Sequence, residues 1–377
     1  MSDSQSNSSR AAVPHIRRPR AIVYCEANFG AIDGKTANGL VRHSERYDII
    51  SVIDSTLAGQ DTGMVLDAEL NGIPICRDLH DAMTQGGPAP ELFIVGVAPT
   101  SGMLSKIERS VLLDAMSHGL SIVNGLHEFL NDDPEFAAAA AINSVEITDV
   151  RRPRAKTDLR MFDGSIHDVT CPRIAVLGTD GAIGKRTTAT ILTNALNDQG
   201  VRAVLVGTGQ TSLIQGARHA VALDAIPAQF VTGELEATVV EAFEVESPDV
   251  IIVEGQGALS HPTYLSSTAV LRGSLPAAVI LQHAPARKTI SDFPNYVMPT
   301  AISEINLIET FTDTNVIGLT INHEDMTDSE VTTAITMYEL ELDIPATDAL
   351  TRPTDRLLDM VFTAFPDLEE RSPIALR

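Results

Sequence analysis

Residues 173–189 read RIAVLGTDGAIGKRTTA and decide the fold of the chain around them. Residues 174–177 predict a buried β-strand, because a short aliphatic run bounded by glycine is typical of a parallel sheet. The glycines that follow let the backbone turn its N–H groups toward an anion, at the positive end of a helix predicted to begin at Lys185. The stretch therefore predicts a phosphate-binding loop.

This loop departs from the standard pattern in two ways. Five residues rather than four separate Gly178 from Gly184. Arg186 follows Lys185 where a Ser or Thr hydroxyl ordinarily binds Mg²⁺. A loop with Arg beside Lys can hold phosphates by charge alone, without a firmly coordinated metal.

The segment GTDGAIGK resembles the loop of dethiobiotin synthetase and its relatives, which also begins Gly-Thr-Asp and accommodates the extra residue. Two threonines follow Arg186. The residues expected to contact a phosphate-bearing ligand are Gly178, Thr179, Asp180, Gly181, Gly184, Lys185, Arg186, Thr187 and Thr188.

The composition narrows the classes of partner. The 377 residues suffice for two domains, and 50 acidic against 27 basic residues give a net charge of −23. This charge argues against nucleic acid and anionic membranes as partners. With only five lysines and no Trp, the composition suggests a cytoplasm of high salt, where dense carboxylates stay hydrated and their repulsion is screened. A merely soluble acidic surface is the alternative.

The chain shows no sign of export or membrane insertion. No apolar run approaches the roughly 20 residues that span a bilayer, and the N-terminus lacks the apolar centre of a secretory signal. The three cysteines are isolated from one another, so neither a disulfide framework nor a zinc site is expected. The sequence predicts a cytoplasmic protein.

The first half of the chain predicts a Rossmann-like, doubly wound α/β domain over residues 20–150, after a disordered tail at residues 1–19. Short apolar runs predict parallel strands over 21–26, 48–54, 73–76, 91–99 and 121–125. Helices are expected between them, over 35–43, 78–83, 106–118 and 134–142. Residues 151–172 contain four arginines and two prolines and predict a linker.

Residues 173–377 predict a second parallel α/β domain, of the P-loop NTPase type. Its expected strands are 174–178, 202–207, 249–254, 277–281 and 315–322. Its expected helices are 185–198, 227–243, 302–311, 328–338 and a last one from 354 onward.

Several residues at predicted strand ends can carry chemistry. Glu254 ends a buried strand, where a carboxylate can hold Mg²⁺, order water or accept a proton, and it resembles the Val-Glu-Gly of dethiobiotin synthetase. His261 and His283 can each be a general base or a structural histidine. Asp224 is a second acidic candidate or a turn residue. Asn322 ends a strand where related P-loop proteins place an Asn against adenine.

A second glycine-rich stretch, GAIDGKT at residues 30–36, follows the first predicted strand. It can be an anion site for a substrate carboxylate or an ordinary helix start. Lys35 and Thr36, together with Arg287, are the candidates for binding substrate.

Taken together, these pieces resemble the D-glutamate N-acetyltransferase family, long described as two-domain proteins of unknown function, across residues 20–365. The motifs are GKTA at 34–37, VIDS at 52–55, GLHEFL at 125–130, DVR at 149–151, GTD at 178–180 with GK at 184–185, GTGQT at 207–211 and EGQG at 254–257.

The resemblance implies acetyl transfer from acetyl-CoA to the amine of D-glutamate. The loop residues, with Arg186 in place of the metal-binding hydroxyl, predict no obligatory metal. An enolase-type N-acetylglutamate epimerase would be the pathway partner, and a homo-oligomer is expected. The family occurs in marine bacteria and halophilic archaea, which agrees with the composition. The reaction needs a base, for which Glu254, His261 and His283 are candidates, and Arg287 or Lys35 would hold the substrate carboxylates.

The residues alone predict only a phosphate-anchored ligand, so other classes stay open. One is an ATP-dependent ligase or kinase like dethiobiotin synthetase, with Thr187, Asp224 and Glu254 around Mg²⁺. Another is a non-catalytic nucleotide-sensing protein.

Overall fold

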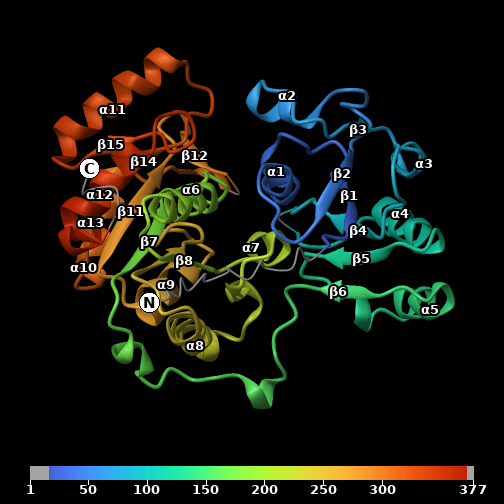
Figure 1. Cartoon of the computed structure of the whole chain (residues 1–377), viewed down its shortest axis with the longest axis horizontal. Helices are drawn as coiled ribbons and strands as arrows, with labels where there is room; N and C mark the ends of the chain where they lie inside the picture. The colour runs from blue at the N-terminus through green and yellow to red at the C-terminus, as the bar shows by residue number, and fades with distance from the viewer. Residues whose placement is uncertain (1–16, 100, 292, 372–377) are drawn as a thin grey trace, which may run out of the picture.

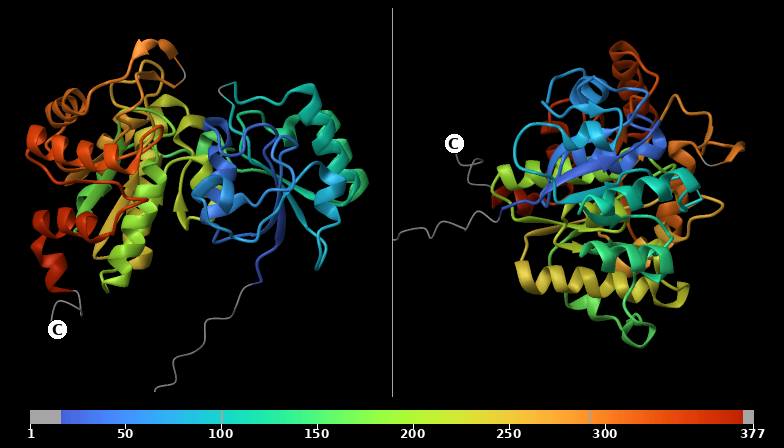
Figure 2. Two further views of the ribbon diagram at one scale, coloured as in Figure 1. Left: turned by 90° about the horizontal axis from the view of Figure 1, so that it is seen from above. Right: turned by 90° about the vertical axis from the view of Figure 1, so that its right-hand side faces the viewer.

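The structure is a computed structural model that describes residues 17–99, 101–291 and 293–371. It contains two parallel β-sheets, each surrounded by helices, lying side by side (Figures 1 and 2). This arrangement confirms the predicted fold class. The disorder expected for residues 1–16 lies outside the described residues.

The N-terminal sheet has the order β3-β2-β1-β4-β5-β6. This is the strand order of a Rossmann fold, in which ligands bind outside the carboxyl ends of the strands near β1 and β4. The strands are β1 (Arg20–Tyr24), β2 (Asp48–Ile53), β3 (Ile75–Cys76), β4 (Leu92–Val95), β5 (Ser121–Asn124) and β6 (Ile147–Asp149). The helices are α1 (Lys35–Arg42), α2 (Thr62–Asp67), α3 (Leu79–Met83), α4 (Lys106–Ser117) and α5 (Pro134–Asn143).

The helix starts in this domain follow local chemistry. Ser105 and Glu108 form a capping box at α4, each side chain accepting a backbone N–H from the other end of the turn. Asp133 caps α5 ahead of Pro134, whose fixed φ suits the first helical position. These signals explain why α4 and α5 begin where the sequence predicts.

The C-terminal sheet has the order β15-β14-β11-β7-β10-β8-β9, so the strand that leads into the predicted loop is central. Its strands are β7 (Arg173–Gly178), β8 (Ala203–Gly207), β9 (His219–Ala220), β10 (Val250–Glu254), β11 (Ala278–His283), β14 (Asn315–Ile321) and β15 (Ala346–Thr347). A hairpin of β12 (Thr289–Ile290) and β13 (Phe293–Val297) stands apart from it. The helices are α6 (Lys185–Asp198), α7 (Gln210–Gln215), α8 (Ala228–Glu246), α9 (Ser266–Ser274), α10 (Ala301–Phe311), α11 (Asp328–Leu342), α12 (Asp355–Ala364) and α13 (Pro366–Glu370).

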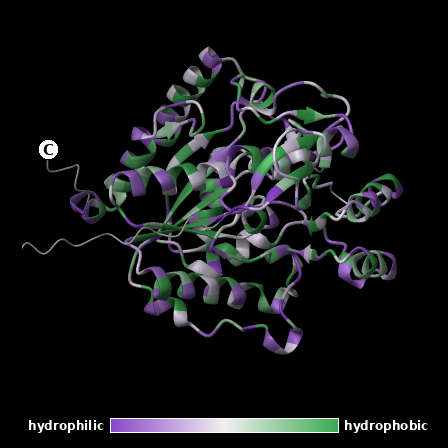
Figure 3. Ribbon diagram, turned by 45° about the vertical axis from the view of Figure 1, so that its right-hand side comes forward, coloured by the Kyte–Doolittle hydropathy of each residue, from purple (hydrophilic) through white to green (hydrophobic). Residues whose placement is uncertain are grey.

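The central strands are covered on both faces. Every residue of β10 and β11 is buried, as continuous aliphatic runs predict for a parallel sheet between helix layers. Separate apolar clusters pack on the two faces, one containing Leu235 of α8 and the other Leu192 of α6. Hydrophobic residues accordingly gather along the strands in the middle of each domain (Figure 3).

The segment between β6 and β7 is fixed to the second domain. The buried carboxylate of Glu236 on α8 accepts backbone N–H groups from Asp163, Gly164 and Ile166, at 2.9–3.2 Å. Because a charged acceptor with several donors is well satisfied, these contacts hold the connecting chain against α8.

Helix α7 joins the domains by packing on α1 (Figure 1). The side-chain amide of Gln215 donates to the carbonyl oxygens of Gly39 and His43, at 2.7 and 2.9 Å. A Cβ at Gly39 would lie 3.2 Å from Gln215 and Thr211, so glycine allows the helices to approach closely. No helix among the described residues is long and apolar enough to cross a membrane.

Candidate functional site

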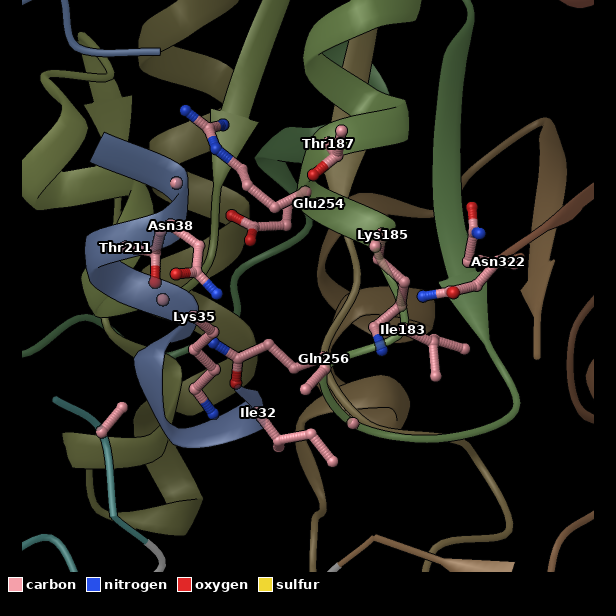
Figure 4. A pocket seen from close by; sticks show the side chains of 18 of the residues that line it. Ile32, Lys35, Asn38, Ile183, Lys185, Thr187, Thr211, Glu254, Gln256 and Asn322 are labelled. Carbon is pink, nitrogen blue, oxygen red and sulfur yellow. The ribbon is translucent and has the colours of Figure 1, made fainter. Parts of the chain in front are cut away.

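A cavity of about 560 Å³ lies between the domains. One wall is formed by the 181–188 loop and by Glu254, Gln256, Gln282 and Asn322, at the carboxyl ends of strands of the second sheet. The other wall is formed by α1 and by the loops that follow β4 and β5. Figure 4 shows Lys35 and Lys185 on opposite walls, with Gln256 between them. The cavity thus brings together both glycine-rich stretches singled out in the sequence.

The predicted loop forms and ends at the N-terminus of α6. Gly184 precedes the helix with φ of 98°, a conformation that disfavours any residue with a side chain. No side chain caps this end of α6 in the described structure, so its N–H groups have no side-chain acceptor, and residues 181–188 around it line the cavity. An uncapped helix N-terminus with a basic residue is a built anion site.

Lys185 is the buried cation of this loop. Its side-chain nitrogen donates to the carbonyl oxygen of Asp180, and the residue is 6% exposed. Burial lowers the pKa of Lys185 to about 8, while the carboxylates of Asp180 and Glu254 oppose the shift. An arriving anion would favour the protonated form.

Asp180 and Arg287 brace the loop from behind. The Asp180 carboxylate accepts the backbone N–H groups of Gly181 and Ser291 and lies 2.7 Å from the guanidinium of Arg287. Arg287 also makes two bonds to Glu324, at 2.6 and 2.7 Å. The structure therefore gives Arg287 a role in holding the loop and does not place it on the cavity wall. Its predicted contact with substrate carboxylates has no support in this geometry.

Arg186, in the position of the usual metal-binding hydroxyl, reaches toward the other domain. Its Nε donates to Oε1 of Gln215 at 3.0 Å, and Gln215 is the residue that contacts α1. Its Nη1 is buried without a hydrogen-bond partner among the described residues. Burial lowers the pKa of Arg186, against the opposing charges of Glu254 and Glu45. A cavity-lining guanidinium with an unsatisfied nitrogen suits an anionic ligand.

The two threonines after Arg186 both line the cavity. The hydroxyl of Thr188 is turned inward and donates to Oε1 of Gln282 at 2.6 Å. Thr179 is likewise turned inward, where its hydroxyl bonds to His283. Of the predicted loop contacts, residues 181 and 184–188 line the cavity, while 178–180 lie behind it.

Glu254 lines the cavity from the end of β10 and is 6% exposed. Its Oε2 accepts the backbone N–H of Thr208 at 3.1 Å and the hydroxyl of Ser212. Figure 4 shows the carboxylate directed toward α1. Two donors on one oxygen fix the orientation of the group, which suits a residue that orients a substrate or takes a proton from it.

His261 and His283 do not line the cavity. His261 has its Nδ1 3.2 Å from the backbone N–H groups of Thr263 and Tyr264, and its ring stacks on Tyr264 at 4.3 Å. His283 lies 2.8 Å from the Thr179 hydroxyl, and burial lowers its pKa to about 4. His283 therefore contacts the loop through Thr179, while His261 contacts the turn that follows it. Their role as bases stays a prediction.

Three histidines that the sequence did not single out do line the cavity: His43, His127 and His323. His127 falls within the GLHEFL motif, directly after β5, and His323 is the second residue after β14. For these two, the position just beyond the carboxyl end of a parallel strand, where ligands bind in such folds, was the available signal.

The remaining candidates divide between the cavity and the domain interface. Lys35 and Asn322 line the cavity, and Asn322 accepts the backbone N–H of Glu324 at 2.8 Å. Thr36 is buried, with its hydroxyl 3.4 Å from that of Thr211 in α7. Asp224 lines the cavity but forms an ion pair with Arg151. In the described part of the chain, no group of three or more His, Cys, Asp or Glu residues is arranged to hold a metal ion.

Comparison with known proteins agrees with this architecture. A protein from Tritonibacter scottomollicae named D-glutamate N-acetyltransferase is 29% identical over 289 residues, which are 74% of this chain and 83% of the relative. One from a Pseudoalteromonas species with the same name is 27% identical over 303 residues, 78% of this chain and 86% of the relative. The predicted resemblance to this family is confirmed.

A solved structure and two family profiles give the same result. The crystal structure of a DUF1611 family protein from Anabaena variabilis superposes with a TM-score of 0.84 at 29% identity, over 92% of this chain and 100% of that one. Residues 55–153 match the Rossmann-like domain and residues 160–358 the P-loop domain of this family, both described as domains of unknown function. The chain belongs to the DUF1611 family, in which a Rossmann-like domain precedes a P-loop domain.

Proposed function

We propose that this protein is an N-acetyltransferase that moves the acetyl group of acetyl-CoA to the amine of D-glutamate. The observation that carries the proposal is the cavity itself, in which the uncapped N-terminus of α6, with Lys185 and Arg186, faces Lys35 of the other domain. The names of the two relatives supply the substrate and the transferred group.

The charge of the cavity supports an anionic pair of substrates. The chain has almost two acidic residues for each basic one, 50 against 27, yet the cavity is lined by equal numbers of each. The basic residues are Lys35, Arg42, Arg151, Lys185 and Arg186, and the acidic ones are Asp33, Asp224, Glu254, Glu324 and Asp348. Basic side chains are therefore concentrated where a phosphate-bearing donor and a dicarboxylate acceptor would meet.

The chain's own residues account for the needs of acetyl transfer. The N–H groups before α6, with Lys185 and Arg186, would hold the phosphates of the donor. Lys35, at the start of α1, would hold a carboxylate of the acceptor. Gln256 lies between the two lysines and donates to the Thr208 carbonyl. Glu254 would orient the amine through its fixed carboxylate.

A second function is favoured by one observation. Thr187 and Glu254 both line the cavity beside a P-loop, as expected of an ATP- and Mg²⁺-dependent ligase or kinase. The pairing of Asp224 with Arg151 leaves that carboxylate less suited to complete a magnesium site.

One assay separates the two functions. The pure protein is incubated in molar KCl with D-glutamate and either acetyl-CoA or Mg-ATP, while free thiol and phosphate are measured. We expect thiol release that requires D-glutamate, with L-glutamate and D-aspartate as controls for handedness and length. Phosphate release from ATP without thiol release would contradict the acetyltransferase proposal and favour the ligase.

The setting of the reaction is proposed from composition and resemblance. The N-acetyl product would pass to an epimerase of the enolase type, and the protein would act in a cytoplasm of high salt as a homo-oligomer. The acidic surface of the chain, with its net charge of −23, supports the high-salt setting.

A further inference from the structure

The amine of an amino acid is protonated near neutral pH and must lose a proton before it can attack a thioester. A general base works best when its pKa lies near the working pH, and an imidazole is the side chain that ordinarily meets this condition. Of the histidines that line the cavity, the contacts of His127 fit the task best.

His127 lies in the loop after β5, and its ring is packed on Gly102. A Cβ at Gly102 would be 2.5 Å from Cδ2 of the ring, and the backbone N–H of His127 donates to the Gly102 carbonyl at 2.9 Å. The side chain is 45% exposed, on the cavity. The ring is therefore held in place and remains accessible to a ligand.

The charged groups around His127 come from both domains. Its Nε2 is 3.9 Å from Oδ2 of Asp224, which is held in turn by the buried Arg151. Burial lowers the pKa of His127, and the charges of Arg151 and Lys35 act in the same direction against that of Asp224. The imidazole is therefore neutral, and able to accept a proton, at neutral pH.

One of these cations, Lys35, would also bind the substrate. Lys35 acts electrostatically on both His127 and Lys185, and it lies on the cavity wall opposite Lys185. A dicarboxylate held by Lys35 would place its amine near His127 and the phosphate loop. His323, by contrast, has its Nδ1 bound to Asp348 at 2.6 Å, so this ring nitrogen is already paired within the protein.

The remaining candidate, His43, follows α1 at the far end from Lys35. Burial and the neighbouring Arg42 and Arg186 lower its pKa, and its carbonyl is tied to Gln215. It therefore belongs to the contact between the domains.

We propose that His127 is the general base of the acetyl transfer, taking a proton from the ammonium group of an amino-acid dicarboxylate held by Lys35. The free amine attacks the thioester carbon, the C–N bond forms and the C–S bond breaks. Of the two protons that the nitrogen loses, one passes from His127 to the departing thiolate and the other goes to solvent. This inference rests on the proposed function.

The test compares His127→Gln with His323→Gln and with His118→Gln, whose imidazole is exposed on α4 away from the cavity. For His127→Gln we expect kcat to fall about 100-fold or more, the scale of general-base catalysis, with unchanged CoA binding by calorimetry. The His118 variant should match the wild type. Imidazole added to His127→Gly should restore part of the rate, which a purely structural role would not allow.

The pH profile gives an independent readout. In the wild type, kcat/KM should fall at acid pH because the imidazole becomes protonated, with a midpoint below the ordinary imidazole pKa of about 6.5 since burial lowers the pKa of His127; this acid limb should be absent in His127→Gln. Loss of the limb in the His323 variant alone, or full activity of the His127 variant, would overturn the assignment while leaving the acetyltransferase intact. A wild type that releases no thiol would overturn both. If the Gln variant does not fold, a wild-type profile without an acid limb below about pH 6.5 still refutes the role.

Discussion

Raising the pH from about 7 to about 9.5 should weaken the binding of a phosphate-bearing ligand, because Lys185 loses its proton in this range. Burial lowers the pKa of Lys185 to about 8. Since a bound phosphate favours the charged form, affinity is highest below this pKa. Above it, affinity falls by up to about tenfold per pH unit, until the value for a neutral loop is reached.

The size of the effect follows from the contact that is lost. A hydrogen bond to a charged group contributes about 1.5–3 kcal/mol, which corresponds to about tenfold to a hundredfold in the dissociation constant. Lys185→Ala should therefore bind CoA about tenfold to a hundredfold more weakly at pH 7, with little further loss at pH 9.5. Lys106→Ala, which removes an equal charge from an exposed position on α4, is the matched control.

Calorimetric titration of CoA into the wild type and both variants, across this pH range and in molar KCl, measures these quantities. Lys185→Arg adds a side chain that stays charged throughout and should bind with a flatter pH dependence than the wild type. Unchanged affinity in Lys185→Ala, or the wild-type pH slope retained in that variant, would show that the ligand does not occupy this loop.

Three further outcomes are expected. Arg186→Thr rebuilds the usual loop and removes the contact to Gln215. This variant should bind CoA more weakly and should not gain ATPase activity. A gain in Mg-ATP hydrolysis would favour the ligase instead. Thiol release should continue in excess EDTA, and turnover abolished by EDTA and recovered with Mg²⁺ would show that a metal is required. The melting temperature measured by circular dichroism should fall as KCl is lowered. The screening length grows from about 3 Å at 1 M salt to about 30 Å at 0.01 M, so repulsion among the carboxylates increases. A melting temperature insensitive to KCl would contradict the halophilic interpretation.

The sequence predicted the helices and strands that are determined by residues close together in the chain. Helix α6 begins at Lys185 and ends at Asp198 as expected, because the preceding glycine and the apolar face of the segment act within a few residues. The long buried strands were identified for the same reason. The short strands β6, β9 and β15 were missed, since two or three residues carry no recognisable period and are paired only by their neighbours in the sheet.

The sequence also identified Lys35, Lys185 and Glu254 as site candidates, because a glycine turn before a basic residue and a carboxylate at a strand end are local patterns. It determined the two α/β domains and the phosphate loop by such patterns. Only the tertiary structure decided that α7 packs on α1 and that Arg186 donates to Gln215. It also decided that Arg287 is bound to Asp180 and Glu324. Likewise, it placed His127 on the cavity wall, where His261 and His283 are not found. The direction of each of these side chains depends on partners distant in sequence, and the way the two sheets meet determines which partners are near.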